Sequence, residues 1–340
     1  MKRSNIIISL LISIIFISSC REINVSTVIN KDGSFTRIIT ITGDSSEVLK
    51  LDLPYLINDT WKREFKKDTT NDKNYILTYT KSFSNSSLLN EEISRDTGWR
   101  KKLNRSIHIE KDFGFFYSYL TYVENISAAN PFNEYDYKDY LNKEDILWLT
   151  GKKLALNSSD STKIHDAEDK VDEYLQNALT DDIISVLKNG IKKLNNPTIN
   201  PNQVDKFRDS ISSRVHEWNN KSTYEYVNYF AKWTHSNDIS ELHKIDSVQF
   251  KILDNKMKLL LEVMEMEDYK VLVELPGIIT ETNSVSATGN QVSWSVNANS
   301  ILLENFIMTV ESRVINGWMF VITGIILLLT IVLIVIKFGR

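Results

Sequence analysis

The sequence predicts an α+β protein, in which an antiparallel, strand-rich ectodomain carries a helical insertion and one transmembrane helix follows. Three observations predict this class. Stretches rich in β-branched residues, with apolar and polar positions alternating, occur in residues 20–127 and 244–316. Apolar residues recur at helical spacing within residues 128–243. A run without charge or proline, WMFVITGIILLLTIVLIVI, extends from Trp318 to Ile336.

The first twenty residues, MKRSNIIISLLISIIFISSC, have the pattern of a bacterial lipoprotein leader. Two basic residues precede an apolar core, Ile6 to Ile17, which is short for a spanning helix. The next residues, Ser18-Ser19-Cys20, complete a sequence that resembles a lipobox, and Cys20 is the one cysteine of the chain. We expect residues 1–19 to be a signal peptide and Cys20 to carry acyl chains such as palmitate. The alternative is an uncleaved anchor with an incidental cysteine.

The last apolar run has the length of a membrane span. As a helix it would extend roughly 28 Å at about 1.5 Å per residue, which matches a hydrocarbon core of about 30 Å. Trp318 marks the interface at one end, and Lys337 is expected on the cytoplasmic side of the other. We expect residues 317–337 to span the bacterial cytoplasmic (inner) membrane once and 338–340 to be a cytoplasmic tail. The ectodomain would then be extracytoplasmic, with a lipid anchor at its amino-terminal end.

Composition excludes several classes of partner and site. The 340 residues carry a formal net charge of −4, with 42% apolar and 25% charged residues, which is a globular mixture. A mildly acidic chain does not attract nucleic acid in bulk, so no nucleic-acid partner is expected. One cysteine cannot build a disulfide framework or a thiolate metal site.

The first strand-rich part contains a hairpin and an aromatic strand. Glu22–Asn30 and Ser34–Thr42 alternate around the turn Lys31-Asp32-Gly33. Further strands are predicted at Tyr75–Phe83, at Ser106–Glu110 and at Phe113–Val123, with a turn at residues 110–112 between the last two. The aromatic strand carries rings on both faces, which indicates either a sheet core or a lipid-lined cavity. Its candidate lipid-facing residues are Phe113, Phe115, Tyr117 and Tyr119.

Two clusters mix a tryptophan with basic residues. Such mixtures suit a lipid headgroup surface, because the ring enters the interface while the cations meet phosphate. They also suit edge strands and loops, where lysine prevents aggregation. The candidate headgroup contacts are Trp61, Lys62, Arg63, Trp99, Arg100, Lys101 and Lys102.

The middle of the chain is predicted to be helical. His165–Lys188, Asn202–Trp218 and Tyr224–Trp233 each show apolar residues at helical spacing. Asn189-Gly190 predicts the end of the first helix. These amphipathic faces are expected to pack on one another or on the sheet, and a partner-binding surface is the alternative.

Strands are predicted to return after residue 243. The expected strands are Val248–Leu253, Met257–Met266, Tyr269–Leu275, Ile278–Glu281 and Gln291–Val296. Residues 300–312 are expected to connect the last strand to the span.

Sequence signatures of enzymes are missing. The five histidines do not have zinc-binding spacing, and there is no nucleophile elbow, P-loop or dinucleotide fingerprint. Ser185-Val186-Leu187-Lys188 matches S-x-x-K without the companion motifs of that enzyme class. We therefore expect a protein that is not an enzyme and that has no cofactor and no metal site.

Two groups of residues resemble the LppM-type domain of bacterial lipoproteins. One is Asn30-Lys31-Asp32-Gly33-Ser34, which follows the lipobox, and the other is Leu275-Pro276-Gly277, followed by Asn283, Gly289, Trp294 and a membrane helix. The resemblance implies an α+β domain, membrane anchoring, and the lipid or glycolipid association of the mycobacterial namesake. It supplies no catalytic residues and does not cover residues 128–240.

Two functions are consistent with this sequence. The first is a non-enzymatic, membrane-anchored envelope lipoprotein whose ectodomain binds lipid or a lipid-linked glycan. The second is a protein-interaction module, in which the helical insertion binds an unknown protein of an envelope assembly.

Overall fold

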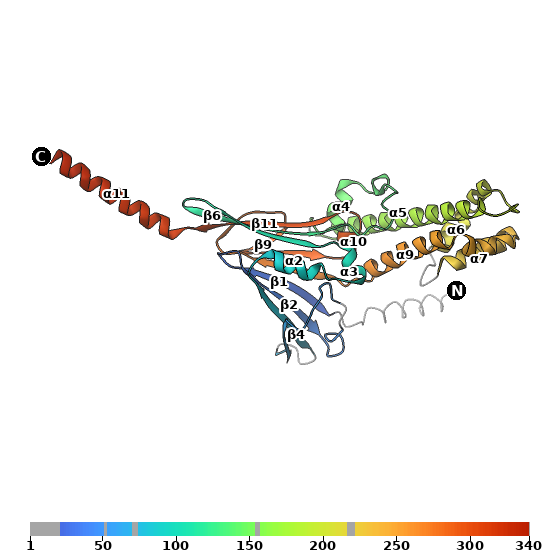
Figure 1. Ribbon diagram of the computed structural model, residues 1–340, viewed down its shortest axis with the longest axis horizontal. Coiled ribbons are helices and arrows are strands. Elements are labelled where there is room, and N and C mark those ends of the chain that lie inside the picture. Colours follow the sequence, from blue (N-terminus) through green and yellow to red (C-terminus); the bar gives the residue numbers. More distant parts are fainter. Residues whose placement is uncertain (1–20, 51–52, 70–73, 154–156, 216–221, 340) are drawn as a thin grey trace. The chain divides into compact units, whose positions relative to one another are not determined.

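The computed structural model describes residues 21–50, 53–69, 74–153, 157–215 and 222–339 (Figure 1). It confirms the α+β class with mainly antiparallel sheets. The chain divides into two compact units. A β unit contains the described parts of Met1–Ile126, Glu267–Asn297 and Phe306–Arg340, and a helical unit contains those of Ser127–Met266 together with Ala298–Asn305.

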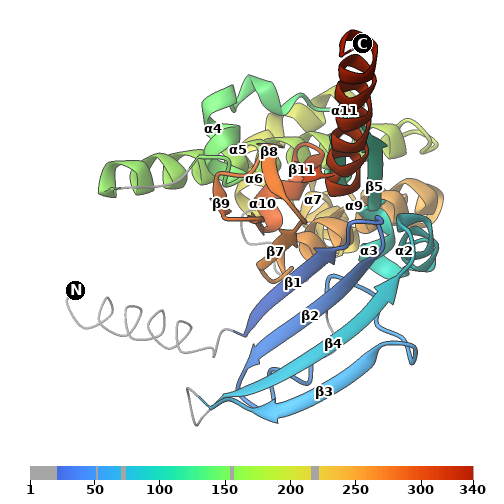
Figure 2. The same cartoon turned by 90° about the vertical axis from the view of Figure 1, so that its left-hand side faces the viewer.

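The β unit contains two sheets. The larger, sheet A, has seven strands in the order β3-β4-β2-β1-β7-β10-β9, and only the β1–β7 pair is parallel among its described pairs. Figure 2 shows β1, β2, β4 and β3 side by side. The bounds are β1 Glu22–Ile29, β2 Phe35–Gly43, β3 Lys62–Lys67, β4 Tyr75–Phe83, β7 Tyr269–Glu274, β9 Ser286–Thr288 and β10 Gln291–Val296.

The predicted first hairpin is confirmed. β1 and β2 pair antiparallel from Glu22↔Thr42 to Ile29↔Phe35. Gly33 takes a positive φ of 88° in the turn, and the Asp32 carboxylate accepts a hydrogen bond from the Ser34 backbone N–H. Alternate residues of β2 are buried, as its pattern predicted.

Sheet B has four antiparallel strands in the order β5-β6-β11-β8. Its strands are β5 Ser106–Phe113, β6 Tyr117–Ile126, β8 Ile278–Thr282 and β11 Phe306–Ile315. Two short helices, α2 (Ser86–Ile93) and α3 (Gly98–Lys102), lie between β4 and β5 in the chain.

The turn between β5 and β6 was predicted at residues 110–112, which is wrong. β5 continues to Phe113, and the turn lies at residues 114–116. A Cβ atom on Gly114 would lie 2.5 Å from the Tyr117 carbonyl oxygen, so this tight turn needs glycine there. The charged residues taken as a turn are exposed positions of an edge strand.

The predicted connection at residues 300–312 is also wrong. The chain forms helix α10 (Ala298–Leu302) and then the ten-residue strand β11, which is an interior strand of sheet B. Its buried positions alternate from Phe306 to Val314. Ser312 occupies one of these buried positions, so a polar residue interrupts the apolar alternation that identifies a strand.

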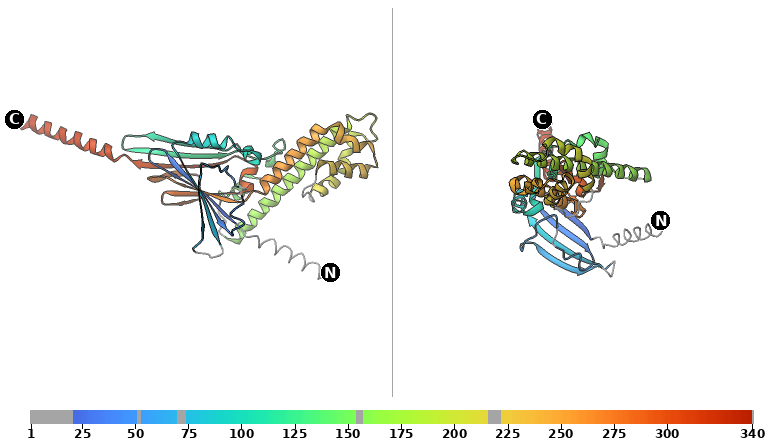
Figure 3. Two further views of the ribbon diagram at one scale, coloured as in Figure 1. Left: turned by 60° about the horizontal axis from the view of Figure 1, so that its bottom comes forward. Right: turned by 90° about the vertical axis from the view of Figure 1, so that its right-hand side faces the viewer.

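The helical unit is built around two long helices, α5 and α9, which run side by side (Figure 3). α5 ends at Ile191, one residue after the predicted cap at Asn189-Gly190. A Cβ atom on Gly190 would lie 3.2 Å from the Leu242 side chain, so glycine allows a close helix contact there. The helices of the unit are α4 Lys143–Leu149, α5 Ser158–Ile191, α6 Arg208–Val215, α7 Thr223–Thr234, α8 Leu242–Ile245, α9 Ser247–Met264 and α10, with 3₁₀ turns η1 Tyr137–Asp139, η2 Pro201–Phe207 and η3 Asp238–Glu241.

The strands predicted at Val248–Leu253 and Met257–Met266 are wrong, because this stretch is helix α9. Its buried residues include Phe250, Leu253 and Met257, which have the spacing of one helical face. Short apolar runs are ambiguous between strand and helix, and leucine, lysine, glutamate and methionine all favour helix here. The helical unit therefore extends to Met266, beyond the predicted end at residue 243.

Helix α11 (Gly317–Phe338) is long and apolar enough to cross a membrane. It contains both ends of the predicted span, Trp318 and Ile336, and Trp318 is exposed. The predicted signal peptide and Cys20 lie outside the described residues.

Candidate functional site

The end of sheet B nearest α11 carries exposed apolar side chains from β5, β8, β11 and the β5–β6 turn. In the register, Phe113 pairs with Ser118, Tyr117 with Ile315, and Arg313 with Ile278, so the same end of all four strands meets there. The side chains of Phe113, Ile278 and Ile315 are 61%, 63% and 60% exposed. We call this surface, comprising residues 113–117, 275–279 and 314–318, the apolar end of sheet B.

One asparagine joins the apolar end of sheet B to α11. Asn316 is the single residue between β11 and α11. Its backbone N–H donates to the Phe116 carbonyl at 2.9 Å, and its side-chain amide donates to the Gly114 carbonyl at 2.8 Å. The Ser118 hydroxyl donates to its side-chain oxygen at 3.1 Å. The β5–β6 turn is therefore fixed to the residue at which α11 begins.

Aromatic contacts extend this junction into the first turn of α11. The Phe113 ring stacks on Trp318 with centroids 6.2 Å apart, and the Phe116 ring lies 4.7 Å from that of Phe320. Aromatic pairs at these separations are favourable beyond the area that they bury. The turn and the helix thus form one continuous aromatic surface.

The structure separates the four predicted lipid-facing residues into two groups. Phe113 and Phe115 are exposed at the apolar end, with Phe115 53% exposed, and they do not line an interior cavity. Tyr117 and Tyr119 are half-buried along β6, and the Arg313 guanidinium lies 4.7 Å from the centre of the Tyr117 ring.

The first basic–aromatic cluster does not form the predicted headgroup surface as a whole. Trp61 is only 6% exposed and packs edge-on against Phe83, so its ring is not free to enter a membrane interface. Lys62 and Arg63 belong to β3, an edge strand in which every residue is exposed. Lysines on an edge strand hinder pairing with a second sheet, which matches the alternative for this cluster.

The second cluster forms helix α3. Trp99 and Arg100 are half-buried, and the Arg100 guanidinium donates to the Leu53 carbonyl at 3.2 Å. Lys101 and Lys102 are exposed. The two lysines remain available to anions, whereas the arginine is engaged with the protein backbone.

A buried polar network lies between the inner faces of the two sheets. Glu124 on β6 pairs with Arg37 on β2, whose Nη2 donates to both carboxylate oxygens at 3.0 and 3.2 Å. The Tyr55 hydroxyl donates to Glu124 at 2.8 Å, and that of Tyr122 also donates. Arg105 lies above the Tyr55 ring with its Nε 3.7 Å from Glu124. We call these residues, with Tyr269, the buried network.

The electrostatics of the buried network keep Glu124 ionised. Burial raises the pKa of the Glu124 carboxyl, but the charges of Arg37 and Arg105 and the tyrosine hydrogen bonds outweigh burial and hold that pKa below its ordinary value. Burial raises the pKa of the Tyr122 phenol, and the negative charge of Glu124 raises it further. The Arg37 and Glu124 side chains have no exposed surface, so water does not screen this pair.

Sequence reasoning missed the buried network. Its members come from β2, the loop before β3, the residue before β5, β6 and β7, and only the fold brings them together. One signal was present: Arg37 occupies an otherwise apolar face of a predicted strand, beside Phe35 and Ile39. A charge at such a position needs a buried partner.

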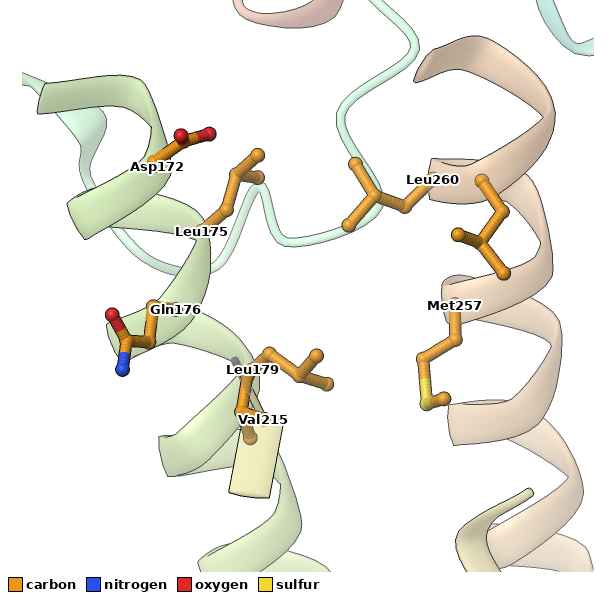
Figure 4. A pocket seen from close by; sticks show the side chains of 8 residues that line it. Asp172, Leu175, Gln176, Leu179, Val215, Met257 and Leu260 are labelled. Carbon is orange, nitrogen blue, oxygen red and sulfur yellow. The ribbon is translucent and has the colours of Figure 1, made fainter. Parts of the chain in front are cut away.

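The helical unit contains an apolar groove of about 220 Å³. Figure 4 shows Leu175 and Leu179 of α5 pointing toward Met257 and Leu260 of α9 across this space. The remaining lining residues are Asp172, Gln176, Val215 and Leu261. Across the described ranges, no group of three or more His, Cys, Asp and Glu side chains could hold a metal ion.

Comparison with known proteins gives one weak resemblance in fold. Neither a family model nor a curated protein matches this chain. Among solved structures, the chain is similar to the folded domain of LppM from Mycobacterium tuberculosis, determined by NMR. The TM-score is 0.28 and the sequence identity 8%, over 87% of this chain and 91% of that domain.

Proposed function

We propose that this chain is a non-enzymatic, membrane-anchored lipoprotein of the bacterial envelope. Its ectodomain is held at the outer face of the cytoplasmic membrane by α11 and by lipid on Cys20. The observation that carries the proposal is the junction at Asn316, where a folded sheet passes into an apolar helix with no flexible linker. Lys337 at the far end of α11 favours a cytoplasmic carboxyl terminus.

Fractionation of a bacterial host that expresses the full chain tests this proposal. A span and an acylated cysteine together make membrane residence effectively irreversible. We expect the protein to remain in the membrane pellet after alkaline carbonate washing, and protease added to spheroplasts to digest the ectodomain. Metabolic labelling with a clickable palmitate analogue is expected to mark the parent chain and not Cys20→Ser. A protein that washes off the membrane would contradict the proposal.

We also propose that the ectodomain binds a lipid or a lipid-linked glycan. Membrane lipid is the partner that the anchors require, and the apolar groove is a place where a single acyl chain would find apolar side chains. The full chain, purified in a non-lipid detergent and extracted with organic solvent, is examined by mass spectrometry. A stoichiometric lipid or lipid-linked glycan supports ligand binding, and its absence removes this part of the proposal.

A second candidate function is protein docking by the helical unit. Exposed apolar side chains follow one another on α8 and α9: Ile245 at the end of α8 is 46% exposed, and Val248 and Ile252, four residues apart on α9, are 66% and 45% exposed. Such a stripe is typical of a helix that binds an apolar groove or a second helix. Crosslinking in the native host tests it: a specific adduct in the parent chain that Val248→Lys abolishes supports docking, and identical adducts in both chains oppose it.

A further inference from the structure

We propose that the apolar end of sheet B is a second membrane-contact surface, which enters the outer-leaflet interface beside the point where α11 enters the bilayer. This inference rests on the proposed function, because it requires α11 to span the membrane. It adds a lipid-binding surface on the folded domain itself, distinct from both anchors.

The composition of this surface is unlike that of the rest of the chain. Charged residues make up 25% of the sequence, yet the segments 113–117, 275–279 and 314–318 contain none. They come from three separate parts of the chain, so the fold has gathered uncharged residues at one place. Gathered apolar side chains, in contrast to scattered ones, mark a binding surface.

The exposed side chains are the large ones. Phe113, Phe115, Ile278, Ile315 and Trp318 are each between 53% and 63% exposed. Two of the segments contain a glycine that brings the backbone in tightly. A Cβ atom on Gly277, which has a φ of 94°, would lie 2.3 Å from the Arg313 carbonyl oxygen. The backbone is therefore fixed while the apolar side chains project outward.

Continuity with α11 identifies the occupant as lipid. The Phe113 ring stacks on Trp318, the first aromatic residue of the span, and Phe116 contacts Phe320 two residues further along. Tryptophan at the end of a span lies at the level of the headgroups. Rings that touch Trp318 and Phe320 lie at the same depth or deeper, where lipid replaces water around them.

The charges that border the surface suit a headgroup layer. Lys111 is exposed on β5, two residues before Phe113, and Arg313 lies over the Tyr117 ring. Basic side chains beside rings that enter the interface are attracted to the phosphates of anionic lipids. Asp112, between Lys111 and Phe113 in the sequence of β5, is also exposed, so one negative charge accompanies these cations.

The inference predicts the pose of the β unit. A span alone allows the domain to tilt and rotate about the entry point. Insertion of the β5–β6 turn and of the β8 start fixes the end of sheet B at the interface. β5 then runs away from the bilayer, so Ser106 lies roughly 24 Å further out than Phe113 at about 3.4 Å per residue.

Spin-label depth measurement on the full chain in phosphatidylglycerol–phosphatidylcholine nanodiscs tests the inference. The parent is Cys20→Ser, so that a single introduced thiol carries the label. The variants are Phe115→Cys at the surface, Ser106→Cys at the opposite end of β5, and Leu327→Cys in the middle of α11. Collision with oxygen, which concentrates in lipid, is compared with collision with a water-soluble nickel chelate.

We expect the label at position 115 to collide preferentially with oxygen, as the label at 327 does, and the label at 106 to collide preferentially with the nickel chelate. If the label at 115 collides with the nickel chelate as often as the label at 106, while the label at 327 still prefers oxygen, the inference is overturned and the span is retained. A protein partner would then be the occupant of this surface. A wet label at 327 overturns the proposed function as well.

Because a label replaces the Phe115 ring, a second variant keeps the ring. A Gly114→Cys label would distort the turn, so the label is placed at Ile278→Cys, on a neighbouring strand of the same end. Depth at 278 that matches depth at 115 supports the surface as a whole. Depth at 115 alone, with 278 wet, contradicts a surface shared by all four strands.

Discussion

At both ends of β6 an aromatic ring lies beside an arginine, but one end is exposed and the other is buried. At the amino-terminal end, Tyr117 lies under Arg313 beside exposed phenylalanines. At the other end, Tyr122 and Glu124 are completely buried with Arg37. The residue types are similar, but the neighbours differ: sheet A covers one end, and helix α11 borders the other.

This difference in burial indicates that the buried end of β6 stabilises the fold and that the exposed end is available for binding. A buried charge depends on its partners, so the network end should tolerate substitution poorly. Exposed rings contribute little to folding and remain available for binding. Substitutions at the buried end of β6 should therefore change the free energy of unfolding, and substitutions at the exposed end should change contact with lipid.

Removal of the Glu124 carboxylate should have the largest effect. Glu124→Gln leaves Arg37 and Arg105 buried without the negative charge that both approach. Breaking a buried pair in this way costs about 3–5 kcal/mol. Chemical unfolding of the full chain in detergent micelles, followed by the loss of β-sheet circular dichroism, measures the change.

The matched control is Glu110→Gln, an exposed carboxylate on the edge strand β5 of the same sheet. It should change the free energy of unfolding by less than about 0.5 kcal/mol. A Glu124→Gln variant as stable as this control would show that the buried network does not depend on its ion pairs. Combined replacement of Arg37, Glu124 and Arg105 by apolar residues should restore part of the lost stability.

Gly277→Ala should have the next largest effect. The alanine Cβ would lie 2.3 Å from the Arg313 carbonyl oxygen at a φ of 94°. Strain of this kind costs on the order of 1–3 kcal/mol. Gly317→Ala is the control, because nothing lies within 4 Å of its Cβ position. Equal unfolding midpoints for the two variants would contradict the close approach of β8 to β11.

The pH dependence of stability should reflect the buried network at both extremes. The folded pKa of Glu124 is lowered below 4.5, so its contribution is present above that pH and is lost as the pH falls through the folded pKa. The folded pKa values of Tyr55 and Tyr122 are raised above 10.0, so their contribution is present below that pH and is lost as the pH rises beyond it.

Unfolding midpoints between about pH 2 and pH 12 measure this dependence, because the unfolded carboxyl and phenol groups titrate within this range. Glu124→Gln should flatten the acid limb relative to Glu110→Gln. The prediction fails if both variants retain the same acid limb.

Phe115→Ser should have the smallest effect on stability. The ring is exposed, so the free energy of unfolding in micelles should change by less than about 0.5 kcal/mol. With the label at position 278, the same substitution should shift collision toward the nickel chelate, because the turn leaves the interface. A large loss of stability would place this ring in the core.

Strands with clear alternation could be predicted from the sequence, and those with mixed signals could not. The β1–β2 hairpin was predicted because its turn and its alternation agree. β11 was missed because Ser312 occupies a buried position, and α9 was taken for strands because its apolar residues occur in short runs. A short apolar run can be assigned to a strand or to a helix only when the surface that it packs on is known.

The apolar end of sheet B and the buried network also differ in how far the sequence predicts them. The aromatic residues Phe113 and Phe115 could be selected from the sequence as lipid-facing candidates, and whether they face membrane lipid is still a prediction. Their position at a turn could not be predicted, because it depends on how closely Gly114 approaches Tyr117. Only Arg37, on an otherwise apolar strand face, signalled the buried network, because its other members come from segments far apart in the chain that only the fold brings together.

Photocrosslinking with lipid tests the central contrast on the unmodified protein. The full chain is reconstituted with a phospholipid that carries a diazirine near its glycerol, irradiated, digested and examined by mass spectrometry. We predict adducts on peptides that contain Phe113–Tyr117 and Ile278 as well as on α11, and none on the peptide segment that contains Tyr122 and Glu124. Adducts confined to α11 would show that sheet B does not touch the membrane, and would contradict the account.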